Sequence, residues 1–286
     1  METGPLFMTK KETNKEPGED LILEDYYHLS IQVSLNGLSF CILDSIGKKI
    51  VRAESRRFSS RLNPFDAQKE LKAFIKSSGV TDYAFSEVVV VHRNDLYSLV
   101  PKVLFDPGEL PNYLKYNAKI LANDLLEYDE IPSFDLVNVY VPFVNINNTI
   151  YDFFGDFEFK HHSSVLIESL LASTSGSNET VCFAHVTPEE LDLIVLKQKK
   201  LVFFNNFSCH TPEDFLYYLL FTMEQLQLDT GETKLRVFGS IEEGDPLFDL
   251  CQEYIQHLSL YIPDLPKDIS SDGPDLQDHY LEINAF

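Results

Sequence analysis

The chain has 286 residues and a formal net charge of −22, because 45 Asp and Glu outnumber 23 Lys and Arg. Nucleic acids and anionic membrane surfaces both attract Lys and Arg, so this charge argues against either one as a partner. With 44% hydrophobic residues, a chain of this length is expected to form about two globular domains or one large one.

The sequence also disfavours two further classes of protein, those held by disulfides or zinc and those inserted in a membrane or secreted. The four cysteines are far apart and show no C-x-x-C pair, which argues against a disulfide framework or a zinc site; they are Cys41, Cys182, Cys209 and Cys251. No stretch approaches the roughly 18 apolar residues of a membrane span, and the first residues lack the apolar run of a signal peptide. We therefore expect a cytoplasmic protein without direct membrane insertion.

In chain order, residues 1–25 are polar and charged and are expected to be a disordered tail. Residues 28–35 alternate as a strand, and Asn36-Gly37 predicts a type I′ hairpin turn with positive φ at both residues. Two more strands are expected over 38–43 and 49–58. Asn63-Pro64 then predicts the start of a helix that Gly79 ends, before a buried strand over 87–91.

The middle of the chain carries weaker signals. The pattern over 101–128 predicts mostly helix, and residues 134–143 predict a strand. A short helix ended by Gly155, an alternating segment over 156–160 and a helix over 165–172 follow. Residues 173–178, Ser-Thr-Ser-Gly-Ser-Asn, are the best candidate for a hinge.

Residues 181–228 repeat the order of the first segment: strand, turn, strand, turn, strand and a helix capped by Thr211-Pro212. In this alignment Asn36-Gly37 matches Glu189-Glu190, Asn63-Pro64 matches Thr211-Pro212, and the strand 88–91 matches 235–238. The sequence thus predicts an internal duplication. A helix after Asp245-Pro246 and a last strand over 258–262 complete it. The expected domains are a first lobe over 26–175, a second lobe over 176–263 and an acidic tail over 264–286.

The order of a three-stranded meander, a helix and further strands occurs twice in the chain. This order resembles the duplicated ribonuclease H-like fold of the actin-like ATPases. The chain is most similar to the cytoplasmic actin-like proteins of type IV pilus and type II secretion machines. The runs LVFFNNFSCHTPEDFLYYLL and RVFGSIEEGDPLFDLCQEYIQHL resemble a family of unknown function from Bacteroidetes bacteria. The resemblance implies an α/β fold of two lobes, with mixed sheets flanked by helices.

The resemblance also implies a nucleotide site, but the residues of this chain differ from the motifs that form that site in the actin-like ATPases. Actin-like ATPases hold phosphate on two Asp-x-Gly hairpins. Here the first turn keeps Gly37 without the Asp, and the second has Pro188 and two carboxylates that repel phosphate. The adenosine motif is reduced to Gly239-Ser240. If Mg-ATP binds, Asn36, Gly37, Gly239 and Ser240 are expected to face it across the cleft.

Other groups of residues that could form a metal or catalytic site are less convincing. His161-His162 with Glu168 or Asp156 suggests a metal, but adjacent strand residues point to opposite faces, so no metal site is predicted. A two-metal nuclease needs acids on the central strands, where Ser30, Gln32, Ser34 and His185 stand instead. No Ser or Cys lies in a nucleophile elbow, so no catalytic residue is predicted.

The sequence therefore favours a non-catalytic actin-like interaction or scaffold protein, a pseudo-ATPase that uses no cofactor. The alternative is an ATPase with altered phosphate motifs that binds Mg-ATP. The resemblance implies a protein partner, and the acidity suggests that it presents a basic segment, as part of a membrane or assembly protein.

Overall fold

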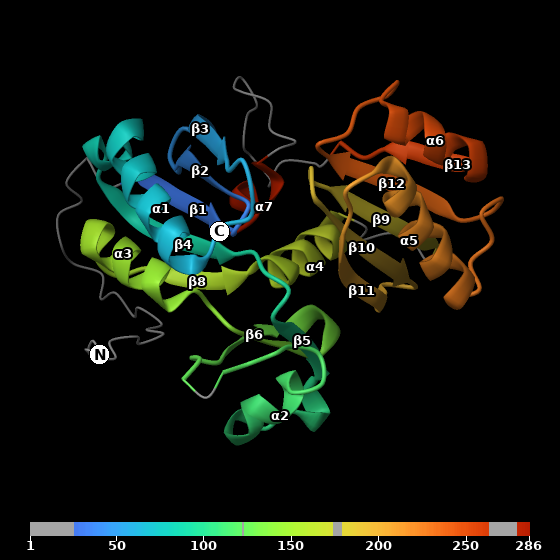
Figure 1. The fold of residues 1–286 in the computed structure, drawn as a ribbon, viewed down its shortest axis with the longest axis horizontal. Coiled ribbons are helices and arrows are strands. Elements are labelled where there is room, and N and C mark those ends of the chain that lie inside the picture. Colours follow the sequence, from blue (N-terminus) through green and yellow to red (C-terminus); the bar gives the residue numbers. More distant parts are fainter. Residues whose placement is uncertain (1–25, 122, 174–178, 263–278) are drawn as a thin grey trace.

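The computed structural model describes residues 26–121, 123–173, 179–262 and 279–286. Its frame consists of two five-stranded sheets with the same strand order (Figure 1). The first, ordered β3-β2-β1-β4-β8, contains β1 (Tyr27–Val33), β2 (Gly37–Asp44), β3 (Lys49–Arg57), β4 (Phe85–His92) and β8 (Glu158–His161). The second, ordered β11-β10-β9-β12-β13, contains β9 (Thr180–Val186), β10 (Glu190–Lys197), β11 (Lys200–Ser208), β12 (Lys234–Gly239) and β13 (His257–Leu260).

Both sheets are mixed in the same way. The first three strands of each pair antiparallel, whereas β4 and β8, like β12 and β13, add in parallel. The predicted internal duplication and the two-lobed α/β fold are therefore confirmed. The duplication was predictable despite the low residue identity between the copies, because strand order depends on the hydrophobic pattern and the turns.

Helices cover the outer faces of both sheets and fill the space between the lobes. The outer helices of the first lobe are α1 (Pro64–Ser78) and α3 (Val144–Phe154), and those of the second are α5 (Pro212–Gln225) and α6 (Pro246–Tyr254). Between the lobes lie α4 (His162–Ser173) and α7 (Tyr280–Ile283) (Figure 1). In the described ranges, no helix is long and apolar enough to cross a membrane.

The starts of α1 and α5 follow their capping signals, whereas Asp245 before α6 makes no side-chain capping bond. The Asn63 side chain accepts hydrogen bonds from the first amides of α1, and Gly79 ends that helix at a φ of 67°. At α5, Thr211 and Asp214 form a reciprocal capping box. Because each cap satisfies amides that lack a partner inside the helix, these two boundaries were predictable from sequence.

The first hairpin turn differs from its prediction. The turn runs from Ser34 to Gly37, and neither Asn36 nor Gly37 has a positive φ, so it is not type I′. The Ser34 hydroxyl accepts hydrogen bonds from the amides of Asn36 (3.1 Å) and Gly37 (2.9 Å). Such a side-chain bond to the backbone stabilises a different turn from the one that the Asn-Gly pair favours.

The prediction of mostly helix over 101–128 is wrong. This region belongs to a small inserted unit with a three-stranded sheet ordered β5-β7-β6, namely β5 (Tyr97–Pro101), β7 (Leu136–Tyr140) and β6 (Glu127–Ile131). Among its described residues, the α-helix α2 (Leu110–Leu114) has a single turn and is accompanied by the 3-10 turns η2 (Lys102–Leu104), η3 (Pro107–Glu109) and η4 (Pro132–Phe134). The 3-10 turn η1 (Val80–Asp82) follows α1. Pro107, Gly108 and Pro111 interrupt the apolar spacing that suggested a longer helix.

Several domain predictions fall outside the described residues. These are the tail over 1–25, residues 174–178 of the hinge and the lobe boundary at 175/176. Of the acidic tail predicted over 264–286, residues 279–286 are described. They contain α7, which packs on β1, β2 and α4. Tyr280, Leu281 and Ile283 are almost fully buried there.

Candidate functional site

The two hairpins at the predicted phosphate positions have the same backbone geometry. The Ser34 amide donates to the Gly37 carbonyl (3.0 Å), and the Thr187 amide donates to the Glu190 carbonyl (2.9 Å). In the first hairpin, the amides of Asn36 and Gly37 are already bonded to the Ser34 hydroxyl. These amides are therefore not free to hold an anion.

Arg93 and Ser240 occupy equivalent places in the two lobes, each directly after the central parallel strand. The Arg93 amide donates to the Val33 carbonyl (2.9 Å), and the Ser240 amide donates to the Val186 carbonyl (2.8 Å). Both side chains make contacts with the opposite lobe. Arg93 reaches strand β10, while the Ser240 hydroxyl receives a hydrogen bond from Arg57 of β3 at 3.3 Å. The duplication thus brings equivalent positions to the seam between the lobes.

Arg93 is the centre of a buried ionic cluster. Its Nε lies 2.7 Å from Glu190 Oε2, and its Nη2 lies 2.8 Å from Asp192 Oδ2. Asp192 is fully buried and is approached by three further side chains: His185 Nδ1 (2.9 Å), His162 Nε2 (3.2 Å) and Asn206 Nδ2 (2.7 Å). This arrangement satisfies a carboxylate that would otherwise be costly to bury.

The charges of the cluster follow from these contacts. Burial by itself raises the pKa of Asp192, but the Arg93 guanidinium and the hydrogen-bonded His162 and His185 hold it well below its usual range. Burial would lower the pKa of Arg93, and the two carboxylates raise it instead. Asp192 is therefore ionised and Arg93 is protonated across the whole neutral range.

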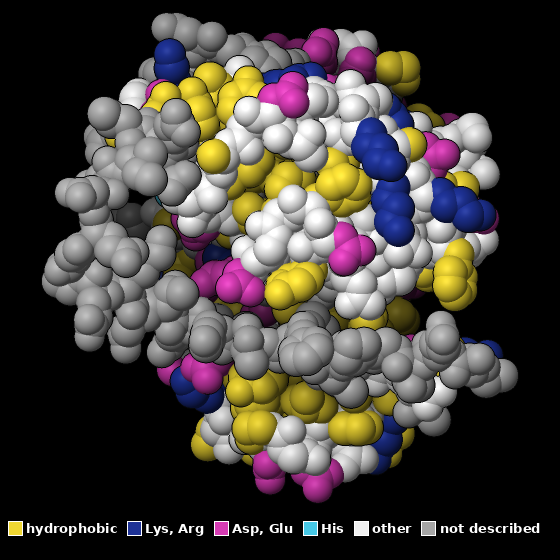
Figure 2. All heavy atoms as spheres, turned by 90° about the vertical axis from the view of Figure 1, so that its left-hand side faces the viewer, with side chains coloured by type: hydrophobic (Ala, Val, Ile, Leu, Met, Phe, Trp, Pro, Cys, Tyr) yellow, Lys and Arg dark blue, Asp and Glu magenta, His cyan; other side chains and the backbone are white. Residues whose placement is uncertain are grey.

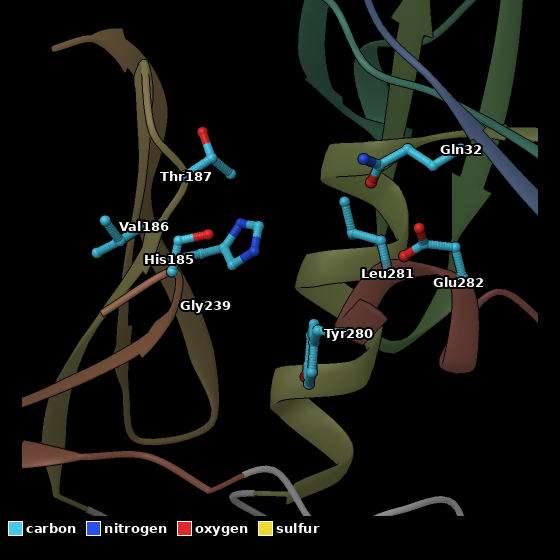
Figure 3. Close-up of a pocket in the computed structure, with 9 residues that line it drawn as sticks. Gln32, His185, Val186, Thr187, Gly239, Tyr280, Leu281 and Glu282 are labelled. Carbon is cyan, nitrogen blue, oxygen red and sulfur yellow. The ribbon is translucent and has the colours of Figure 1, made fainter. Parts of the chain in front are cut away.

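His185 connects this cluster with the seam between the lobes. Burial lowers its pKa, so the ring is neutral at neutral pH. A neutral ring beside the ionised Asp192 donates its proton from Nδ1, which leaves Nε2 as a hydrogen-bond acceptor. In Figure 3 the ring points from the second lobe toward the space in front of α7.

That space is a small cavity between the lobes. Its volume is about 30 Å³. Its lining comes from both lobes and from α7: Gln32, His185, Val186, Thr187, Gly239, Ser240, Tyr280, Leu281 and Glu282 (Figure 3). A buried water needs roughly 10–15 Å³ by this measure, so the cavity has room for about two waters. Drug-sized ligands occupy pockets of about 300–1,000 Å³.

The comparisons with known proteins agree with the observed fold. A family model described as a protein of unknown function, DUF3822, matches residues 19–258. The chain belongs to the DUF3822 family. No curated protein matches it.

Two solved structures are similar to this DUF3822 chain. A Bacteroides thetaiotaomicron protein, described as having an actin-like ATPase fold and unknown function, is 19% identical, with a TM-score of 0.75 over 93% of this chain and 98% of its own. The PilM–PilN type IV pilus biogenesis complex is 10% identical, with a TM-score of 0.61 over 90% of this chain and 97% of that chain. At these identities the likeness concerns the fold, which is the actin-like ATPase fold.

Of the four residues predicted to face a nucleotide, two line the cavity described above and two do not. Gly239 and Ser240 line the cavity between the lobes. Asn36 and Gly37 do not line it, and on β1 the lining residue is Gln32. The link between the two pairs is Arg57, which is opposite Gly37 in the β2–β3 register and bonds to Ser240.

The two histidines lie differently from their prediction. His161 ends β8 and His162 begins α4, so they are not consecutive residues of one strand, and their ring centroids are 4.4 Å apart. His161 Nδ1 bonds to Ser163 (2.7 Å), and His162 faces Asp192. Among the described residues, no group of three or more His, Cys, Asp or Glu is placed to hold a metal ion.

Sequence reasoning missed Arg93 and Asp192. The signal for Asp192 was present, because it is the one charged residue inside the apolar run Leu191–Leu196. A charge in the middle of a buried strand implies a buried counter-charge. The partner could not be identified from sequence, since Arg93 is 99 positions away and in the other lobe.

Proposed function

We propose that this chain is a non-catalytic actin-like interaction or scaffold protein. The observation that carries the proposal is the position of α7 in the seam between the lobes. Tyr280 and Leu281 pack in the core that joins the two lobes, together with residues of α4 and β9. The cavity beside α7, about 30 Å³, is an order of magnitude smaller than a pocket for a small organic ligand.

The hairpins support the same conclusion. The amides of Asn36 and Gly37 are bonded to Ser34, so binding phosphate there would first break these bonds. At the second hairpin, the Glu190 carboxylate is held in place by Arg93. A phosphate approaching this turn would meet a negative charge whose counter-ion is already paired.

For the partner, we propose a protein. The PilM–PilN complex, in which a protein of this fold is associated with another protein, supports it. The finer proposal is a Lys/Arg-rich segment of a membrane or assembly protein, because a net charge of −22 steers positively charged segments toward the chain. We place this function in the cytoplasm. Pull-down with a Lys-rich peptide at low and high salt tests whether charge attraction drives this binding. Equal binding at the two salt concentrations would contradict the proposal of a Lys/Arg-rich partner.

The second candidate function is a nucleotide-binding ATPase with altered phosphate motifs. One observation favours it. Gly239 and Ser240, the residues that correspond to the reduced adenosine motif, line the cavity between the lobes. For this function α7 would have to leave the seam before Mg-ATP could enter.

A thermal melt with and without millimolar Mg-ATP separates the two candidates. A ligand present at 100 times its dissociation constant adds about 2.7 kcal/mol of stability, which corresponds to several degrees in melting temperature for a chain of this size. The scaffold proposal predicts no shift beyond that caused by magnesium and ionic strength alone. A shift of several degrees that ATP produces and an equal concentration of sulfate does not would overturn it.

A further inference from the structure

The charge of this acidic chain is unevenly distributed. Residues 48–76 contain nine of the 23 Lys and Arg but only three of the 45 Asp and Glu, a net charge of +6. The rest of the chain therefore carries −28. This segment is β3, the edge strand of the first sheet, followed by α1 on the outer face of that sheet.

The outward side of α1 presents three lysines. Lys69, Lys72 and Lys76 are spaced three and four residues apart, which places them on one side of a helix, and all three are exposed. Lys69 lies 2.7 Å from Asp66, with 78% of its side chain exposed. For Lys72 and Lys76 no ion pair is found among the described residues. Two of the three charges are thus not locally neutralised.

Strand β3 extends this positive surface. Arg56 lies against α1, where it bonds to Ser77 (2.9 Å) and stacks 4.8 Å above the Phe74 ring. Its carboxylate neighbour, Glu70, is 3.9 Å away, and both side chains are partly exposed. We call Lys69, Lys72, Lys76 and Arg56 the basic face.

An exposed apolar side chain adjoins the basic face. Phe65, in the first turn of α1 and one helical turn before Lys69, is 71% exposed. Helices α1 and α3 are in contact, because Gln68 bonds to Thr149 at 2.9 Å. Figure 2 looks at the side of the molecule where α1 and α3 lie and shows a row of Lys and Arg side chains beside hydrophobic ones.

We propose that the basic face is a docking surface for an acidic segment of a partner protein, with an apolar side chain of that segment covering Phe65. Charge complementarity selects the occupant, since the lysines attract carboxylates and the Phe65 ring supplies apolar contact area. This surface is separate from the seam between the lobes, and its test does not depend on whether nucleotide binds there.

Extended polyanions fit this surface less well. Beyond α1, the exposed residues include Asp152 on α3 and, after that helix, Asp156 and Glu158. A membrane surface or a nucleic-acid duplex reaching past α1 would meet these acids and the remaining negative charge of the chain. A short acidic segment that lies along α1 does not reach these acids.

The test uses a fluorescein-labelled Glu/Leu peptide and measures its anisotropy with the full chain. We expect saturable binding that weakens as salt rises from about 0.05 M to about 0.5 M, where the Debye length falls to a few ångströms. The variant Lys69→Glu/Lys72→Glu/Lys76→Glu should bind at least about tenfold more weakly, because it replaces three attractions with three repulsions. The neutral variant Lys69→Gln/Lys72→Gln/Lys76→Gln should be intermediate, and far-UV circular dichroism verifies that both are folded.

The matched control is Lys197→Glu/Lys199→Glu/Lys200→Glu, which makes the same change in net charge on the exposed β10–β11 turn of the other lobe. We expect this control to change the affinity by less than about threefold. Equal losses in the two charge-reversal variants, or no saturable binding of the peptide by the unmodified chain, would overturn the proposal. Preferential binding to phosphatidylserine vesicles over the peptide would overturn the choice of a protein partner.

Discussion

The ionic cluster between the lobes makes a quantitative prediction about stability. The substitution Arg93→Met keeps most of the side-chain volume and removes the positive charge. It leaves Asp192 fully buried, and Glu190 largely buried, without the guanidinium that lies 2.8 Å and 2.7 Å from them. Breaking a buried ion pair by removing one partner typically costs 3–5 kcal/mol, so we expect a loss of about that size in the free energy of unfolding.

The loss should also depend on pH. In the unmodified chain the Asp192 pKa is lowered, so its stabilising contribution is present above the unfolded value of about 3.9 and is lost as pH falls through the lower folded value. In Arg93→Met the buried carboxyl lacks its strongest counter-charge, and its folded pKa should rise above the unfolded one. Protonation then favours the folded state, so the deficit should shrink between about pH 7 and about pH 5.

Urea unfolding followed by far-UV circular dichroism measures both effects, because the chain has no Trp to report by fluorescence. The control is Lys102→Met, which removes an ion pair of similar length (2.6 Å) whose two side chains are about half exposed. An exposed pair contributes about 0–1 kcal/mol, so this control should differ little from the unmodified chain. Equal losses in Arg93→Met and Lys102→Met, or a deficit that stays the same as pH falls, would show that Arg93 does not stabilise the fold by neutralising Asp192.

Three further predictions concern the frame around the seam. Gly239 and Gly244 have φ values of 92° and 90°, but of the two only Gly239 would place a Cβ against a backbone oxygen, that of Val186. Gly239→Ala should therefore lose clearly more stability in urea than Gly244→Ala, and equal losses would contradict the steric explanation. Asn63→Ala and Thr211→Ala should each cost about 1 kcal/mol, because they remove equivalent helix caps, and a loss at one site alone would show that the capping is not equivalent. A chain ended after Asp278 should expose Cys41, which packs against Ile283 of α7, to a thiol reagent; continued protection would mean that α7 does not cover this thiol.

The frame was predictable from the sequence to the extent that it depends on local signals. The strands of both meanders and the caps at Asn63 and Thr211 were recognised from apolar runs and capping residues. The inserted unit was misjudged because its strands are only five residues long and are separated by turns with apolar residues at helical spacing. Short segments of this kind are stabilised by contacts with distant strands, which periodicity does not report.

The site was less predictable than the frame. Gly239 and Ser240 were identified as site candidates through the resemblance, and they line the cavity. The contacts that fill the seam join residues far apart in the chain: Arg93 with Asp192, and Ile283 of α7 with the Cys41 region of β2. Each requires knowledge of which elements meet, which no local pattern provides.

We propose that α7 closes the space in which a nucleotide would bind, and a crystal structure grown in millimolar Mg-ATP tests this proposal. Tyr280 and Leu281 should remain packed between the lobes, as they are in Figure 3, with no nucleotide against Gly239 and Ser240. Density for ATP and magnesium between the lobes, with α7 displaced, would contradict it.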